Sequence, residues 1–515
     1  MNWTTTGVFV LLFAAVTVLG FIAARWRRGD LSRLDEWGLA GRRFGTVVTW
    51  FLLGGDLYTA YTFVAVPALV FGAGAIGFFA VPYTLLAYPI VFLVFPRLWS
   101  VAHRHGYITA SDFVDGRFGN RSLAVAVAVT GILATMPYIA LQLVGIEVVI
   151  AGMGFTARGL AGDLPLIIAF AILAAYTYSS GLRAPALIAL VKDMLIYITV
   201  IAAIVVIPAH LGGYAAIFRQ IPSDKLFLAR PTQGNVGVYS AYATLALGSA
   251  LALFLYPHAV TGLLSAKSRT VIKRNTAILP AYSLALALIA ALGYMAFAAH
   301  VDANPAYAGY FKRYGPNFAV PALFLDQFPA WFVGVAFAAI AIGALVPAAI
   351  MSIAAANLFT RNIYRDLFHK TLQGAEEATA AKRVSLVIKV GALAFILFLP
   401  TKYAIQLQLL GGIWIIQTLP AIMIGLFTNR LHGRALLTGW AVGMFVGTVM
   451  AATQHFQSSI YPLQVGDLTV PGYAALYSLV ANLVVTFVLS ALLDLAGVKR
   501  GPDATAPEDY RGGEA

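Results

Sequence analysis

The sequence predicts an all-α polytopic membrane protein built from two five-helix repeats. Of its 515 residues, 60% are hydrophobic and only 11% are charged, whereas a soluble chain carries about 25% charged residues. Apolar stretches of about 18 residues or more, each long enough to cross about 30 Å of hydrocarbon, recur along the whole chain. Two of these stretches contain clusters of glycine and proline. Too little polar surface remains to solvate a globule, which excludes a soluble enzyme and a disordered scaffold.

We expect thirteen helical spans, because the alternating pattern of barrel strands is absent. They lie at 6–24, 46–71, 76–96, 122–151, 164–180, 186–208, 239–263, 275–299, 331–358, 384–400, 405–427, 436–454 and 473–495. The first is a retained span and not a signal peptide, because Arg25, Arg27 and Arg28 follow its apolar run instead of preceding it.

Lysine and arginine predict the orientation of the chain. With the N-terminus outside, 25 of the 34 lysine and arginine residues fall in inner segments and seven in outer ones, while Lys192 and Lys389 lie within spans. We therefore expect a multi-pass protein of the cytoplasmic (inner) membrane, with its N-terminus outside and its C-terminus inside. The net charge of +13 belongs to the inner loops and does not indicate nucleic-acid binding. The last twenty residues are predicted to form a disordered tail.

No pattern in the sequence predicts an enzyme. The chain has no cysteine, which excludes disulfides, thiolate metal sites and a cysteine nucleophile. Its eight histidines are scattered, and neither a hydrolase triad nor a phosphate-binding loop is present. We expect no cofactor, no certain metal site and no obligate protein partner, so the partners are a small solute and the bilayer.

Two predicted spans are interrupted at corresponding positions. The second contains Gly54-Gly55-Asp56, and the seventh contains Gly248 and Tyr256-Pro257-His258. In lipid, backbone groups must be satisfied, so such breaks are typical of helices that line a cavity. Because five spans separate the starts of the two helices, the pattern indicates an inverted-repeat transporter with its site at the breaks. An ordinary kink or packing notch is the alternative at each helix.

Four segments carry a resemblance to a known family: 41–45 (Gly-Arg-Arg-Phe-Gly), 107–119, 256–268 and 348–364. On these segments the chain resembles the sodium:solute symporter family. That resemblance implies the LeuT-type five-plus-five inverted repeat with one extra N-terminal and two extra C-terminal helices. It divides the chain into an extra helix with its inner loop, two repeats, two final helices and a tail, at 1–45, 46–208, 209–427, 428–495 and 496–515.

Within the family, residues 56–67 and 412–420 resemble the bacterial monocarboxylate permeases. This resemblance alone implies import of lactate, pyruvate, propionate or similar acids, and we predict a cation-coupled symporter. A sodium-coupled symporter of another small organic solute is an alternative. A transporter-like membrane sensor is another, although the segment after Leu495 is too short for a signalling domain.

The resemblance also implies a sodium site. By position it would use the backbone carbonyls near Gly55 and Tyr58 in the first broken helix. The Ala349 carbonyl and the Ser352 hydroxyl would lie across from them, with Asp193 close by.

Two residues depart from the family pattern at this site. Ile353 stands where the family usually has a second hydroxyl, and Lys192 stands where it usually has a neutral residue. We hypothesise that the Lys192 ammonium occupies the sodium region, pairs with Asp56 or Asp193, and couples transport to protons instead of sodium. The alternatives are a structural ion pair between Lys192 and Asp193, and an Asp56 side chain that bonds the free amides of the break.

A monocarboxylate would bind free backbone N–H groups at the start of a half-helix, where the helix dipole favours an anion. The candidate residues are Thr59, Ala60, Tyr61 and Thr62 at the first break, Tyr256 and His258 at the second, and Gln142 and Gln417 on neighbouring spans. Each glutamine could instead bond a packed neighbour, and His258 could be structural. Glu147 stays unassigned, and Lys389 is expected to reach the membrane interface.

Overall fold

The computed structural model describes residues 2–26, 29–55, 57–155, 160–398 and 404–511. Its helices are α1 (Trp3–Ile22), α2 (Leu34–Leu39), α3 (Thr46–Gly55), α4 (Val66–Ala73), α5 (Ala80–His105), α6 (Ala110–Phe118), α7 (Arg121–Gly152), α8 (Leu160–Ser180), α9 (Arg183–His210), α10 (Tyr214–Gln220), α11 (Ser223–Leu226), α12 (Val238–Leu253), α13 (Pro257–Leu264), α14 (Arg269–Ile278), α15 (Pro280–Ala298), α16 (Ala308–Tyr314), α17 (Ala319–Gln327), α18 (Ala330–Leu358), α19 (Gly374–Phe398), α20 (Ala404–Ile415), α21 (Gly433–Thr453) and α22 (Ala474–Leu495). One antiparallel hairpin joins β1 (Ile460–Val465) to β2 (Leu468–Tyr473).

The long helices form one bundle around α18, which packs against α1, α7, α9, α13 and α19. This helix is rich in alanine and glycine, and small side chains let neighbouring backbones approach closely in a membrane. Its side chains are buried over most of its length. The two final helices, α21 and α22, pair with each other beside α20.

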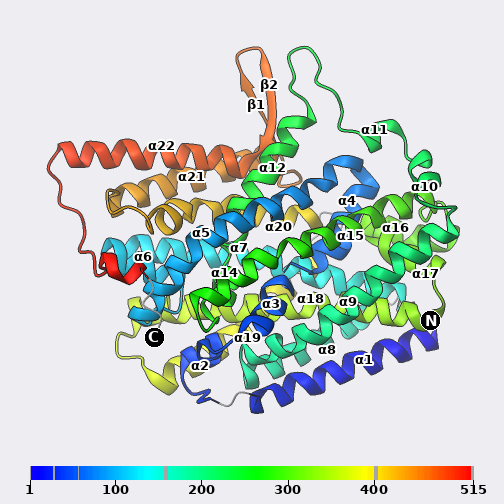
Figure 1. The fold of residues 1–515 in the computed structure, drawn as a ribbon, viewed down its shortest axis with the longest axis horizontal. Coiled ribbons are helices and arrows are strands. Elements are labelled where there is room, and N and C mark those ends of the chain that lie inside the picture. Colours follow the sequence, from blue (N-terminus) through cyan, green and yellow to red (C-terminus); the bar gives the residue numbers. More distant parts are fainter. Residues whose placement is uncertain (1, 27–28, 56, 156–159, 399–403, 512–515) are drawn as a thin grey trace.

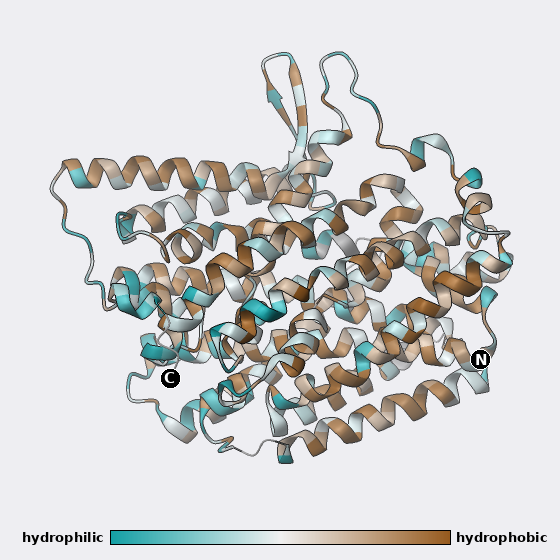
Figure 2. Ribbon diagram, in the orientation of Figure 1, coloured by the Kyte–Doolittle hydropathy of each residue, from teal (hydrophilic) through white to brown (hydrophobic). Residues whose placement is uncertain are grey.

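The bundle has the composition of a membrane protein. Eight helices of the described chain are long and apolar enough to cross a bilayer, and the bent pair of α12 and α13 makes up to nine. The remaining predicted stretches coincide with shorter apolar helices or with helix ends, so the total of thirteen spans and the domain boundaries stay predictions. The two chain ends lie at opposite ends of the bundle (Figure 1). Hydrophilic segments gather near α2, α6 and the C-terminal end, whereas the long helices are mostly hydrophobic (Figure 2).

Both predicted interruptions are present. The first lies between Gly55, where α3 ends, and a π-helical turn over Tyr61–Ala65 that leads into α4. The second separates α12 from α13, which meet at 49°. There Tyr256 has an extended backbone (φ −58°, ψ 138°), because the ring of a following proline disfavours helical geometry. The breaks free backbone groups in the middle of two helices.

The structure also departs from the prediction at two places. The chain was predicted to be all-α, but residues 460–473 form the β1–β2 hairpin, whose turn contains Gly466 at φ +58°. Its second strand also bonds a preceding loop, since the Thr469 amide donates to the Gly234 carbonyl at 2.8 Å.

The prediction of a disordered tail is wrong for the described residues up to 511. Asp503 pairs with Arg117 at 2.6 Å, Asp509 pairs with Arg104 at 2.9 Å, and the Tyr510 ring lies beneath the Arg117 guanidinium. These ion pairs hold the tail against α5 and α6.

Candidate functional site

Lys192 lies at the first break, on the inward face of α9. Its ammonium donates to the Gly55 carbonyl and, at 3.2 Å, to the Tyr58 carbonyl. The side chains of Lys192 and Asp193 are both fully buried, and their charged atoms are 3.1 Å apart. The two carbonyls accept from the lysine because the interrupted helix leaves them outside the regular backbone ladder. One cation, supplied by the protein, therefore occupies the two carbonyls of the first broken helix that the resemblance assigned to sodium.

A cluster of tyrosines surrounds this ion pair. The Tyr282 hydroxyl of α15 donates to Asp193 at 2.8 Å, and the Tyr58 hydroxyl donates to the Tyr282 carbonyl at 3.2 Å. The Tyr58 and Tyr282 rings are 4.6 Å apart, and Tyr197 packs against both. The sequence analysis missed Tyr282 and Tyr197. The only signal for them was a tyrosine within a mainly apolar span.

On the opposite side, α18 approaches the Tyr58 carbonyl at Gly343, where an added Cβ would lie 3.8 Å from that oxygen. Ser352 lies nine residues further, or about 13 Å along the helix. Its hydroxyl donates to the Ala349 carbonyl at 2.8 Å, and Ile353 is fully buried beside it. The structure therefore does not bring Ala349 and Ser352 against the Tyr58 carbonyl. The remaining predicted member, Asp56, lies outside the described residues.

At the first break the chain's own side chains cap the predicted substrate-binding amides. The Gln142 side-chain oxygen accepts from the Ala60 amide at 3.0 Å, and the Thr59 hydroxyl accepts from the Tyr61 amide at 3.0 Å. The Thr62 hydroxyl donates to the Leu57 carbonyl. An incoming carboxylate would have to replace these acceptors. Gln142 is thus brought to the break as predicted.

Aromatic side chains gather at the second break. The Tyr256 hydroxyl donates to the Gln408 carbonyl at 3.1 Å, and the Tyr138 ring lies 5.4 Å from both Tyr256 and His258. The Tyr61 hydroxyl is buried with no hydrogen-bond partner among the described residues. A buried hydroxyl without a partner is costly, so Tyr61 is available to a polar ligand between the breaks.

Gln417 is not at either break. Its amide donates to Ser478 at 2.9 Å, and its oxygen accepts from Asn482 at 3.1 Å, both on α22. Gln417 therefore hydrogen-bonds a packed neighbouring helix, which was the alternative to a role in substrate binding. Lys389 does not reach the interface as expected, because its side chain is buried in α19, with its ammonium 3.5 Å from the Ser385 carbonyl. Glu147 pairs with Arg313 of α16 at 2.8 Å.

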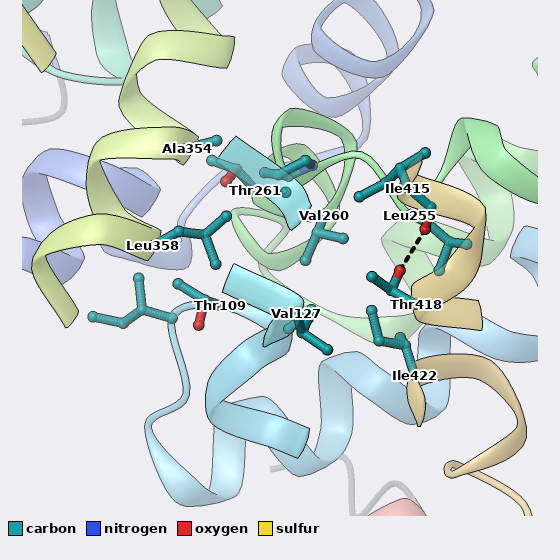
Figure 3. Close-up of a pocket in the computed structure, with 14 residues that line it drawn as sticks. Thr109, Val127, Leu255, Val260, Thr261, Ala354, Leu358, Ile415, Thr418 and Ile422 are labelled. Carbon is teal, nitrogen blue, oxygen red and sulfur yellow. Dashed lines mark hydrogen bonds between the residues drawn. The ribbon is translucent and has the colours of Figure 1, made fainter. Parts of the chain in front are cut away.

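A narrow cavity of about 20 Å³ begins at the second break (Figure 3). Residues from α7, α13, α18 and the end of α20 line it, together with Ile108, Thr109 and Ala110 ahead of and at the start of α6. The volume accommodates about one water molecule, so the passage is closed to a three-carbon acid. No cluster of three metal-ligating side chains occurs in the part of the chain that the structure describes.

Comparisons with known proteins agree with this fold. The model of the sodium:solute symporter family matches residues 37–447. A protein of Rhizobium johnstonii named monocarboxylate transport permease protein is 53% identical over 96% of this chain and 98% of its own. An uncharacterized symporter of Bacillus subtilis is 33% identical over 95% of this chain and 94% of its own. The solved structure of a Na⁺-coupled sialic acid symporter superimposes with a TM-score of 0.72 at 16% identity, covering 95% of this chain and 98% of that one.

Proposed function

The chain belongs to the sodium:solute symporter family, and on that premise we propose that it imports small monocarboxylates such as lactate, pyruvate or propionate together with protons. It is an integral membrane symporter with the LeuT-like fold and carries a small solute. The acid carried and the coupling ion are the proposed parts. The substrate class is supported by the Rhizobium johnstonii relative and by the two segments that resemble monocarboxylate permeases.

The position of the Lys192 ammonium carries the proposal of proton coupling. An ammonium and a sodium ion both need oxygen ligands, and the Gly55 and Tyr58 carbonyls with Asp193 provide three for the lysine. Loss of its proton would leave the Asp193 charge uncompensated in a dry site, which costs several kcal/mol. Release is therefore disfavoured while the site is closed and becomes easier when water enters from the inner side. A proton symporter requires this dependence of proton release on the side of the membrane to which the site is open.

The substrate would bind between the two breaks. Its carboxylate would take the place of Gln142 and Thr59 as acceptor from the Ala60 and Tyr61 amides, and the Tyr61 hydroxyl would complete the contact. A proton moving inward with each carboxylate makes the step electrically neutral. The excess of lysine and arginine on inner segments supports an outer N-terminus, an inner C-terminus and insertion in the cytoplasmic membrane.

Uptake of radiolabelled lactate into proteoliposomes tests the proposal. One arm uses an inward sodium gradient at equal pH, and the other uses an acid-outside gradient without sodium. We expect accumulation from the pH gradient alone. Strict dependence on sodium would instead support the alternative of a sodium-coupled symporter, for which the family and the Na⁺-coupled structural neighbour are the observations in favour. No lactate accumulation in either arm would contradict the assignment of substrate.

A further inference from the structure

A second, polar cavity of about 540 Å³ lies at the end of the bundle that carries α2 and the start of α19. It is lined by Arg33, Arg42, His103, Ile108, Arg361 and Glu377. It is separate from the two breaks and plays no part in the site described above. Some of its arginines form an ion pair with a carboxylate, and one does not.

Of the arginines that line it, only Arg42 has no carboxylate partner among the described residues. Arg33 pairs with Asp35 at 3.1 Å, and Arg361 pairs with Asp112 at 3.0 Å. Arg42 donates one hydrogen bond, from Nη2 to the Tyr107 carbonyl at 2.5 Å, while its Nη1 is buried with no partner in the described chain. Burial lowers the pKa of Arg42 to about 10, so the guanidinium remains charged at neutral pH.

The backbone holds Arg42 in an unusual conformation. Ala40, Gly41 and Arg42 have φ values of +50°, +64° and +56°, which non-glycine residues rarely adopt. For Ala40 and Arg42 such backbone is strained, and it persists where the surroundings require it. Here it holds the Arg42 side chain in the lining of the cavity, with a buried Nη1 that has no acceptor among the described residues.

The cavity adjoins the narrow passage that leads from the second break. Ile108 lines both, and the passage continues past Val260 to Leu255 and Pro257 at the break (Figure 3). The segment between the two spaces is fixed by Asp112, whose carboxylate accepts from the Ile108 amide at 2.8 Å and pairs with Arg361. Ile108 therefore lies between the cavity at the second break and the cavity that Arg42 lines.

We propose that Arg42 forms a carboxylate-binding site at the inner mouth of the translocation path, where the transported acid is held after it passes Ile108. The site rests on the proposed function. A carboxylate offers Nη1 the acceptor that it lacks, and a guanidinium binds a carboxylate through two parallel hydrogen bonds. The fixed charge also lowers the barrier for an anion to leave the apolar passage, because the passage itself supplies no cation among its lining residues.

Membrane vesicles of the two orientations test this site by measuring the KM for labelled lactate from each face. Arg42→Gln should raise the KM about tenfold or more at the face that carries the C-terminus, and change it less than about twofold at the other face. Arg42→Lys should have an intermediate effect. Arg500→Gln is the matched control, because this exposed arginine pairs with Asp494 and does not line the cavity, and it should leave both values unchanged.

Equal changes at both faces, or no change at either, would overturn the proposal while leaving lactate transport by the wild type intact. Absence of transport by the wild type would instead contradict the proposed function. A second measurement needs no transport: phenylglyoxal modification of Arg42, followed by mass spectrometry of the purified protein. Lactate at millimolar concentration should slow that modification. Protection by inorganic phosphate with none by lactate would overturn the assignment to carboxylates.

Discussion

The Lys192 ammonium fills the cation site, so replacing Lys192 with alanine should empty the site and make the stability of the protein depend on sodium. The change removes the partner of Asp193 and of the Gly55 and Tyr58 carbonyls. Breaking a buried ion pair on one side costs about 3–5 kcal/mol, so the unfolding temperature should fall clearly in sodium-free buffer. Sodium entering the vacated oxygens at a hundred times its Kd would return about 2.7 kcal/mol. The assay is thermal unfolding of the purified protein across a sodium titration.

Lys192→Met provides the matched variant, because its side chain fills the space and leaves no room for an ion. It should be destabilised without responding to sodium, and the wild type should not respond either. Lys389→Met controls for loss of a buried lysine elsewhere, since among the described residues the Lys389 ammonium hydrogen-bonds only the Ser385 carbonyl of its own helix. If sodium stabilised the wild type as much as it stabilises Lys192→Ala, the Lys192 ammonium would not be what keeps sodium out of this site.

Three further predictions follow from the contacts. Tyr282→Phe removes the hydroxyl that donates to the buried Asp193 carboxylate of α9 and should slow pH-driven uptake severalfold. Tyr294→Phe, on the same helix but bonded to the Lys225 carbonyl of α11, should not, and equal effects would argue against a role of Tyr282 in coupling. Gln142→Leu leaves an amide of the first break without its acceptor, which costs about 1–3 kcal/mol, and should lower the unfolding temperature; an unchanged transition would show that another group replaces it. Burial alone would raise the pKa of Asp509, but hydrogen bonds from His105 and a backbone amide hold it below its ordinary value of 3.8. The carboxylate therefore holds the tail at neutral pH and loses that effect as the pH falls below about 4, so anisotropy of a dye at the C-terminus should drop there, and already at pH 7 in Asp509→Asn.

The positions of the long apolar helices and of both breaks were predictable from the sequence. Bilayer thickness sets the length of an apolar stretch, and backbone N–H and C=O groups must be hydrogen-bonded in lipid. The Gly54-Gly55 pair and the Tyr256-Pro257 step marked the interruptions correctly. Lys192 was also expected within a span, and its side chain is fully buried in α9.

Contacts between distant helices were not predictable. Gln417 bonds Asn482 because the final helix α22 packs closely enough for hydrogen bonds, and nothing within 405–427 indicates that neighbour. Tyr282 reaches Asp193 from a helix 89 residues further along the chain. The tail of polar residues had a composition typical of disorder, yet its carboxylates form ion pairs with Arg104 and Arg117 on the surface that it covers.

Measuring proton movement during lactate uptake tests most directly whether Lys192 carries the coupling proton. Proteoliposomes that contain a trapped pH-sensitive dye receive lactate in sodium-free buffer at equal pH, and protein-free liposomes give the background from diffusion of the free acid. We expect the wild type to acidify the interior above that background, and Lys192→Met not to do so. Lactate uptake by the wild type without acidification, or acidification that persists in Lys192→Met, would contradict the assignment of the coupling proton to Lys192.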